Sequence, residues 1–300
     1  MYSEPVGIAK SAIFKAHRLG ASCFSILALC VETMAFLDFH FFSDALGLTC
    51  SAWILIPQPA TGQIGMDGGA LREKYPTLYL LHGLSDDHTI WTRRTSIERY
   101  AAAKNIAVVM PAVGRSFYQD MASGRKYWTF VSEELPALCE RLLPLSTARE
   151  ERFAAGLSMG GYGAFRLGLA KPERFAAVAS LSGALDMPRR ARDAGKAGSR
   201  VSLEEWIGIL GPNLKVDGTN SDLHFLAQKL ASSRGPKPGF YLACGTEDEL
   251  LEDSRAFRQQ LEALRLPATY VEGPGSHEWG YWDAQIQKVL DWLPLAQNGR

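Results

Sequence analysis

Gly156-Leu-Ser-Met-Gly160 is the stretch that decides the fold, because of what stands on either side of it. The run 152–155 before it predicts a strand, and residues 161–170 after it have a helical pattern. A strand, a Gly-x-Ser-x-Gly turn and a helix form a nucleophile elbow, which exposes a serine hydroxyl at a tight turn. Glycine two positions before and after the serine relieves the crowding there. An ordinary Gly-rich turn is the alternative, and the flanking elements favour Ser158 as a nucleophile.

The histidine that would activate this serine should lie late in the chain. In proteins with a nucleophile elbow of this kind, the acid follows the serine and the histidine comes last. Only His224 and His277 follow Ser158. His224 lies in the helical pattern 222–230, where a packed or surface role is more common. His277 lies in the loop 273–280, directly after a strand pattern, from which a side chain can reach the serine. The sequence therefore predicts His277 as the general base.

The acid is expected after the strand pattern 239–244, where Glu247, Asp248 and Glu249 compete. All three also fit a solvated helix start, because acidic residues favour the first helical turn. Only one needs to turn inward, and we assign Asp248, which would hold the imidazole in the correct tautomer. Asp186 is a weaker contender, because it follows the next strand after the elbow.

The loop after the strand pattern 75–81 should complete an oxyanion hole, since this loop supplies one of its two backbone amides. Gly83 permits the turn, so the N–H of Leu84 is the candidate, paired with the N–H of Met159 at the helix start. His82 is expected to be a buried histidine hydrogen-bonded to the backbone, without a catalytic role.

Aromatic residues near these motifs are candidate substrate contacts, although aromatic side chains more often belong to the core. They are Trp91, Tyr127, Trp206, Trp279 and Trp282.

The motifs together carry a resemblance to a known family. The chain resembles the esterase D-type branch of the α/β-hydrolases, which includes tributyrin esterases, S-formylglutathione hydrolases, feruloyl and acetyl-xylan esterases and mycolyl transferases. The segments that carry it are 36–48, 80–84, 127–136, 156–163, 244–248 and 275–279. The resemblance implies an α/β-hydrolase fold with the same triad and oxyanion amides. It favours the tributyrin-type esterases, because the S-formylglutathione hydrolases carry a cysteine near the oxyanion loop that this sequence lacks.

The expected activity is therefore that of a serine carboxylesterase, which hydrolyses short-chain acyl esters through an acyl-enzyme on Ser158. Acyl transfer and an S-formylglutathione hydrolase-like thioesterase activity are the alternatives within the same chemistry. A non-catalytic binding protein on a hydrolase scaffold is a third, disfavoured by the intact serine, acid and histidine. No cofactor is expected, and no Cys/His spacing resembles a metal site.

Composition agrees with an enzyme that acts on small molecules. The 300 residues include 32 Lys and Arg and 32 Asp and Glu, a balance that predicts neither a nucleic-acid nor a membrane-surface partner. The one basic cluster, 188–196, is expected to be a solvated loop. Five scattered cysteines suit a reducing compartment, so we expect a cytoplasmic protein in which Cys50, Cys139 and Cys244 are buried. A small-molecule ester is the expected partner, and a homo-oligomer stays open.

The first 33 residues are predicted to be an extension outside the domain 34–300. The apolar run 19–31 follows basic residues, but it is too short to span a bilayer and no clear cleavage site follows. We therefore favour an upstream extension over a secretion signal, and an extra packing helix is the alternative.

Strand and helix patterns alternate through the rest of the chain, which predicts a mostly parallel sheet flanked by helices. Strand patterns lie near 36–42, 50–57, 77–81, 106–110, 152–156, 175–180, 239–244 and 268–272. Helical patterns lie near 91–103, 133–143, 160–170, 202–210, 221–232, 250–265 and 281–293. The first two strands have only a short link and should form an antiparallel edge. The segment 184–238 is longer than a single crossover connection between parallel strands needs, and it is predicted to form a small helical cap over the serine.

Overall fold

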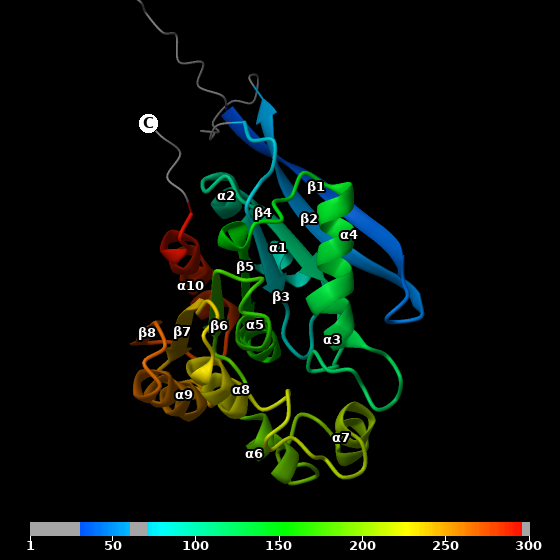
Figure 1. Ribbon diagram of the computed structural model, residues 1–300, viewed down its shortest axis with the longest axis vertical. Coiled ribbons are helices and arrows are strands. Elements are labelled where there is room, and N and C mark those ends of the chain that lie inside the picture. The colour runs from blue at the N-terminus through cyan, green and yellow to red at the C-terminus, as the bar shows by residue number, and fades with distance from the viewer. Residues whose placement is uncertain (1–30, 61–70, 296–300) are drawn as a thin grey trace, which may run out of the picture.

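The central sheet runs through the whole of the computed structural model, which describes residues 31–60 and 71–295. The described residues form eight strands in the order β1-β2-β4-β3-β5-β6-β7-β8 (Figure 1). They are β1 (Val31–Ser43), β2 (Leu48–Ala60), β3 (Thr77–Leu81), β4 (Ala107–Pro111), β5 (Arg152–Leu157), β6 (Ala177–Leu181), β7 (Gly239–Gly245) and β8 (Ala268–Gly273). Each corresponds to a predicted strand. The predicted N-terminal extension lies, up to residue 30, outside the described residues.

The first two strands form the predicted antiparallel edge, and β2 also pairs antiparallel with β4. From β4 onward every neighbouring pair in the sheet is parallel. The sheet is therefore mostly parallel, and the carboxyl ends of β3, β5, β6 and β7 lie along one edge. Loops that leave this edge carry the residues of the candidate site, as is usual for open α/β sheets.

The helices connect these strands and cover the two faces of the sheet. They are α1 (Ile90–Arg94), α2 (Ile97–Ala102), α3 (Tyr127–Thr129), η1 (Phe130–Glu134), α4 (Leu135–Leu142), η2 (Arg149–Glu151), α5 (Met159–Ala170), α6 (Met187–Arg192), α7 (Leu203–Leu210), α8 (Leu223–Ser232), α9 (Leu251–Ala263) and α10 (Trp279–Trp292). Buried residues of α4, α5, α8 and α9 pack on one face and those of α1, α2 and α10 on the other. Successive residues of the central strands alternate between the two cores, as the pleat requires. Within the described residues, no helix is long and apolar enough to cross a membrane.

Two local predictions are wrong, and both have a side-chain cause. The helical pattern 91–103 is two helices, because the Thr95 hydroxyl donates to the Trp91 carbonyl (2.6 Å) and accepts from the Ile97 amide (3.1 Å). The basic cluster 188–196, predicted as a solvated loop, begins with the helix α6, which Asp186 caps. The three described cysteines are free and buried as expected.

The predicted cap segment 184–238 divides between two places. Its helices α6 and α7 lie beyond the ends of the strands, at the bottom of Figure 1. Helix α8 instead packs against α5 and α9, in the layer that covers the sheet. The residues of this segment that reach the site therefore come from its first half.

Candidate active site

Ser158 stands at the turn between β5 and α5, with φ 53° and ψ −116°. This conformation is in the left-handed region, where a non-glycine residue is uncommon and strained. The turn is compact because Gly156 and Gly160 lie against each other. A Cβ on Gly156 would come within 2.5 Å of the Gly160 backbone. The strand, turn and helix of the predicted elbow are thus all present.

Gly160 also brings the elbow into contact with the loop after β3. A Cβ at this position would lie 2.4 Å from the Leu81 carbonyl oxygen and 2.7 Å from that of His82. Met159 begins α5, so its amide belongs to the first helical turn, whose N–H groups have no acceptor within the helix. Leu84, on the loop after β3, lines the same cavity as Met159 and Ser158.

His82 orients the peptide group that carries the Leu84 amide. Its Nε2 accepts from the Val113 amide (3.0 Å), so the neutral ring carries its proton on Nδ1 and donates to the Gly83 carbonyl (2.7 Å). The C=O and N–H of one trans peptide point in opposite directions, so the Leu84 N–H faces away from the His82 ring. Burial lowers the pKa of His82 to about 4. As expected, His82 is buried and bonded to backbone.

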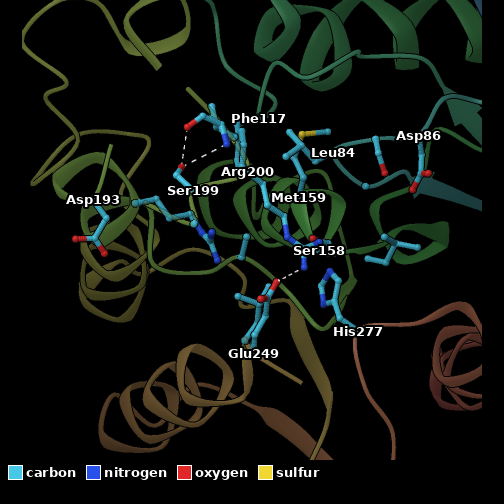
Figure 2. A pocket seen from close by; sticks show the side chains of 18 of the residues that line it. Leu84, Asp86, Phe117, Ser158, Met159, Asp193, Ser199, Arg200, Glu249 and His277 are labelled. Carbon is cyan, nitrogen blue, oxygen red and sulfur yellow. Dashed lines mark hydrogen bonds and ion pairs between the residues drawn. The ribbon is translucent and has the colours of Figure 1, made fainter. Parts of the chain in front are cut away.

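His277 and Asp248 form a hydrogen-bonded pair. His277 Nδ1 lies 3.1 Å from Asp248 Oδ1 and 3.0 Å from Oδ2. The Asp248 side chain is fully buried, whereas the His277 side chain is 14% exposed and lines the cavity beside Ser158. Figure 2 shows Ser158 and His277 at the centre of this cavity.

The Asp248 carboxyl is held in its charged form although it is buried. Burial raises its pKa, but hydrogen bonds from His277, from the Ser182 hydroxyl and from the Leu250 amide outweigh burial and leave the pKa below the ordinary value. The Leu250 amide donates to Oδ1 at 2.8 Å. A charged, immobilised carboxylate is what an imidazole needs for a fixed tautomer and a stabilised imidazolium.

The other acidic contenders have different partners. Glu247 accepts from the Gly275 amide (2.6 Å), and Asp186 accepts from the Arg189 amide (2.8 Å) at the start of α6. Glu249 forms an ion pair with Arg200 (2.7 Å). Among the four carboxylates considered from the sequence, it is Asp248 that the structure brings to His277. His224, the other histidine after Ser158, packs against Gln260 and Phe257 between α8 and α9.

A cavity of about 780 Å³ opens above Ser158. One part of its wall is apolar and comes from Phe117, Leu157, Met159, Ala184, Val201 and Trp206. Another part is charged and comes from Arg189, Arg190, Lys196, Arg200 and Glu249. The cavity thus offers an apolar wall and a charged wall beside Ser158.

The charged wall is held by ion pairs, which sequence reasoning missed. Arg189 and Arg190 share the buried Asp253 carboxylate, and the Arg190 contact is 3.4 Å. Burial raises the pKa of Asp253 and lowers that of Arg190, while their attraction opposes both shifts. Arg200 reaches across the cavity to Glu249 (Figure 2). The partners of Asp253 lie 63 and 64 residues from it, and Arg200 and Glu249 are also far apart in the chain, so no local pattern reports these pairs.

Three of the five aromatic candidates line the cavity, namely Trp206, Trp279 and Trp282. The structure places the other two elsewhere. Trp91 is buried, donates its indole N–H to the Leu81 carbonyl (3.1 Å) and packs against Trp279 from behind the wall. Tyr127 begins α3 and packs, partly buried, against the core.

The parallel sheet with its serine elbow makes the chain an α/β-hydrolase, the fold of its structural relatives. Residues 69–293 match the family model described as putative esterase, and the chain belongs to this esterase family. It is a carboxylic ester hydrolase of the serine type.

Named relatives agree with this assignment. An acetyl esterase of Caldicellulosiruptor saccharolyticus is 29% identical over 275 residues, which cover 88% of this chain and all of the relative. The substrate-bound structure of the Staphylococcus aureus fluorophosphonate-binding serine hydrolase F is 31% identical, with a TM-score of 0.77 over 87% of this chain and 98% of that one. An S-formylglutathione hydrolase structure from the same organism is 32% identical, with a TM-score of 0.74 over the same shares.

Proposed function

We propose that the chain hydrolyses short-chain acyl esters of small alcohols, with Ser158 as nucleophile, His277 as general base and Asp248 as the acid that orients it. One observation carries the proposal. The strained serine of the elbow and His277 line one cavity, and the buried Asp248 bonds His277 from behind, although the three come from separate parts of the sequence. The likeness to an acetyl esterase supports a short acyl group.

The reaction divides into two steps that use the same residues. Ser158 Oγ attacks the ester carbonyl carbon while His277 Nε2 takes the hydroxyl proton. The Leu84 and Met159 amides hold the oxyanion, and the tetrahedral intermediate collapses as His277 returns the proton to the departing alkoxide. Water then repeats the attack on the acyl-enzyme, the acid is released and Ser158 is restored. Asp248 stabilises the imidazolium in both steps.

Active-site labelling tests this proposal. A fluorophosphonate should label the wild-type chain at Ser158 and abolish hydrolysis of p-nitrophenyl butyrate. Ser158→Ala should take up no label, should lose activity by several orders of magnitude and should keep its fold. Ser199→Ala, which alters another serine of the cavity wall, is the matched control and should keep both label and activity. An active Ser158→Ala variant would refute the proposal.

A thioesterase activity is the second candidate, favoured by the likeness to an S-formylglutathione hydrolase structure. The same residues would attack a thioester, and the charged wall could hold a charged thiol portion. Comparison of kcat/KM for S-formylglutathione and for p-nitrophenyl acetate separates the two. A clear preference for the thioester would replace the carboxylesterase assignment.

A further inference from the structure

Trp282 contacts the base directly and also contacts a serine that lies beside the acid. It lies in the first turns of α10, and its side chain is 5% exposed. Its indole ring meets the His277 imidazole edge to face, with ring centres 4.9 Å apart and planes at 88°. Its indole N–H donates to the Ser182 hydroxyl at 3.0 Å. The rigid Trp282 side chain therefore contacts both the base, His277, and Ser182, which lies at the end of a strand.

Ser182 connects the Trp282 indole with the Asp248 carboxylate. It is fully buried at the end of β6, its amide donates to the Ala243 carbonyl (2.8 Å) and its φ is 48°. An indole N–H is only a donor, so the Ser182 oxygen must act as acceptor toward Trp282. The single hydroxyl proton of Ser182 is then left to donate; Asp248 and the buried Cys244 thiol are the groups it acts on, and the charged carboxylate is the stronger acceptor of the two. Hydrogen bonding by Ser182 lowers the pKa of Asp248, consistent with that direction.

We propose that Trp282 and Ser182 are positioning residues for the acid and the base, linked as Trp282 N–H to Ser182 O–H to Asp248 and, through the ring contact, to His277. This inference rests on the proposed function and deepens it. His277 stands on a loop, so without neighbouring contacts its ring would be free to turn about its side-chain bonds. The Asp248 hydrogen bond fixes one edge of the ring, and the perpendicular Trp282 ring restricts rotation about that edge.

The test uses a tryptophan pair within α10. Trp292 makes a comparable bond, from its indole N–H to the Thr269 hydroxyl at 3.1 Å, but beside Tyr241 and away from the cavity. Trp282→Phe and Ser182→Ala should each lower kcat for p-nitrophenyl butyrate by about 10- to 100-fold, because small misplacements of reacting groups carry costs of this size. KM should change by less than about threefold. Trp292→Phe should keep the wild-type kcat and lose a similar amount of thermal stability.

A second measurement separates positioning from general destabilisation. In an Asp248→Asn background, Ser182→Ala should cause no further loss of kcat, because the carboxylate that it positions is gone. Equal losses from Ser182→Ala in both backgrounds, or equal kcat values for Trp282→Phe and Trp292→Phe, would overturn the inference. Either result leaves the proposed function intact if Ser158→Ala is inactive, whereas an active Ser158→Ala removes both.

Discussion

Three of the seven described non-glycine residues with positive φ lie at or beside the cavity. Ser158, Ser182 and Phe117 are not glycines, yet all three have φ near +50°. Ser158 and Phe117 line the cavity, and Ser182 lies behind Asp248. Such conformations cost on the order of 1–3 kcal/mol each and persist only where the surrounding packing over-determines them. Their position indicates that folding energy is used here to fix Ser158 and the residues beside it.

The role of Asp248 leads to a prediction about amide substitution. Asp248→Asn should lower kcat by about 10⁴-fold, because an amide can hold the His277 ring in the wrong tautomer. Asp186→Asn is the control, since asparagine caps a helix about as well as aspartate and the start of α6 should survive. Steady-state kinetics with p-nitrophenyl butyrate measures both. A near-normal Asp248→Asn together with an inactive Asp186→Asn would transfer the acid role to Asp186.

His82 should make the stability of the protein depend on acid pH. Its pKa is 6.5 in the unfolded chain and about 4 when folded, so the unfolded state binds more protons between these values. The free energy of unfolding should therefore fall as the pH drops from about 6.5 toward 4, by about 3 kcal/mol at most. Urea unfolding at a series of pH values measures this slope. His82→Gln should flatten this slope.

At the scale of elements, the first turn of α5 is joined to the end of β3 by direct backbone contact. Gly160 is the point of contact, because its missing side chain lets the helix reach the Leu81 and His82 carbonyls. The same contact sets the distance between the Met159 amide and the Leu84 amide. A single glycine thus fixes the relative position of the two candidate oxyanion donors, which come from different elements.

Gly160→Ala should therefore destabilise the protein and lower kcat together. The added methyl would meet backbone carbonyls at 2.4 and 2.7 Å, which forces α5 and β3 apart at a cost of about 1–3 kcal/mol. Gly208→Ala in α7 is the control, because its methyl would meet no atom within 4 Å and alanine favours a helix. Thermal melts and kcat for both variants test the prediction. A Gly160→Ala variant with wild-type kcat would show that the contact does not matter for the reaction.

At the scale of the whole molecule, the cavity lies between the sheet edge and the segment 184–206. The sheet edge supplies Ser158 and His277, and this segment supplies the wall with Arg189, Arg200 and Trp206. The ion pair of Arg189 with Asp253 ties the wall to α9. The ion pair of Arg200 with Glu249 ties it to the residue that follows Asp248. The shape of the cavity is therefore a property of packing across the fold.

The apolar wall of the cavity predicts an optimum in acyl length. The kcat/KM for p-nitrophenyl esters should rise from acetyl to roughly butyryl or hexanoyl, with up to ~0.8 kcal/mol for each methylene that is buried. Longer chains should then lose activity, because they meet the wall formed by Phe117 and Trp206. A panel of esters up to palmitoyl measures the profile. Activity that keeps rising to palmitoyl at an oil–water interface would indicate a lipase and contradict this expectation.

The sequence by itself determined the elements and the order of the reactive residues. Strand periodicity, the Gly-x-Ser-x-Gly turn and the late histidine are local patterns. They predicted the eight strands, a strand-to-helix turn at Ser158 and a loop at His277, and the structure has all of these. Even the position of His82 followed from a buried strand that ends in a glycine turn. These features depend on neighbours within a few residues, which the sequence displays directly.

Tertiary structure decided what depends on distant partners. Glu247, Asp248 and Glu249 are equivalent in the sequence, and only the packing of the β7 loop against His277 distinguishes them. The placement of Trp91 behind the cavity wall and the helix within the basic cluster have the same origin. Contacts such as Arg190 with Asp253 and Trp282 with Ser182 join residues 63 and 100 positions apart. A side chain's role there depends on which strand ends become neighbours, and that is settled only when the sheet assembles.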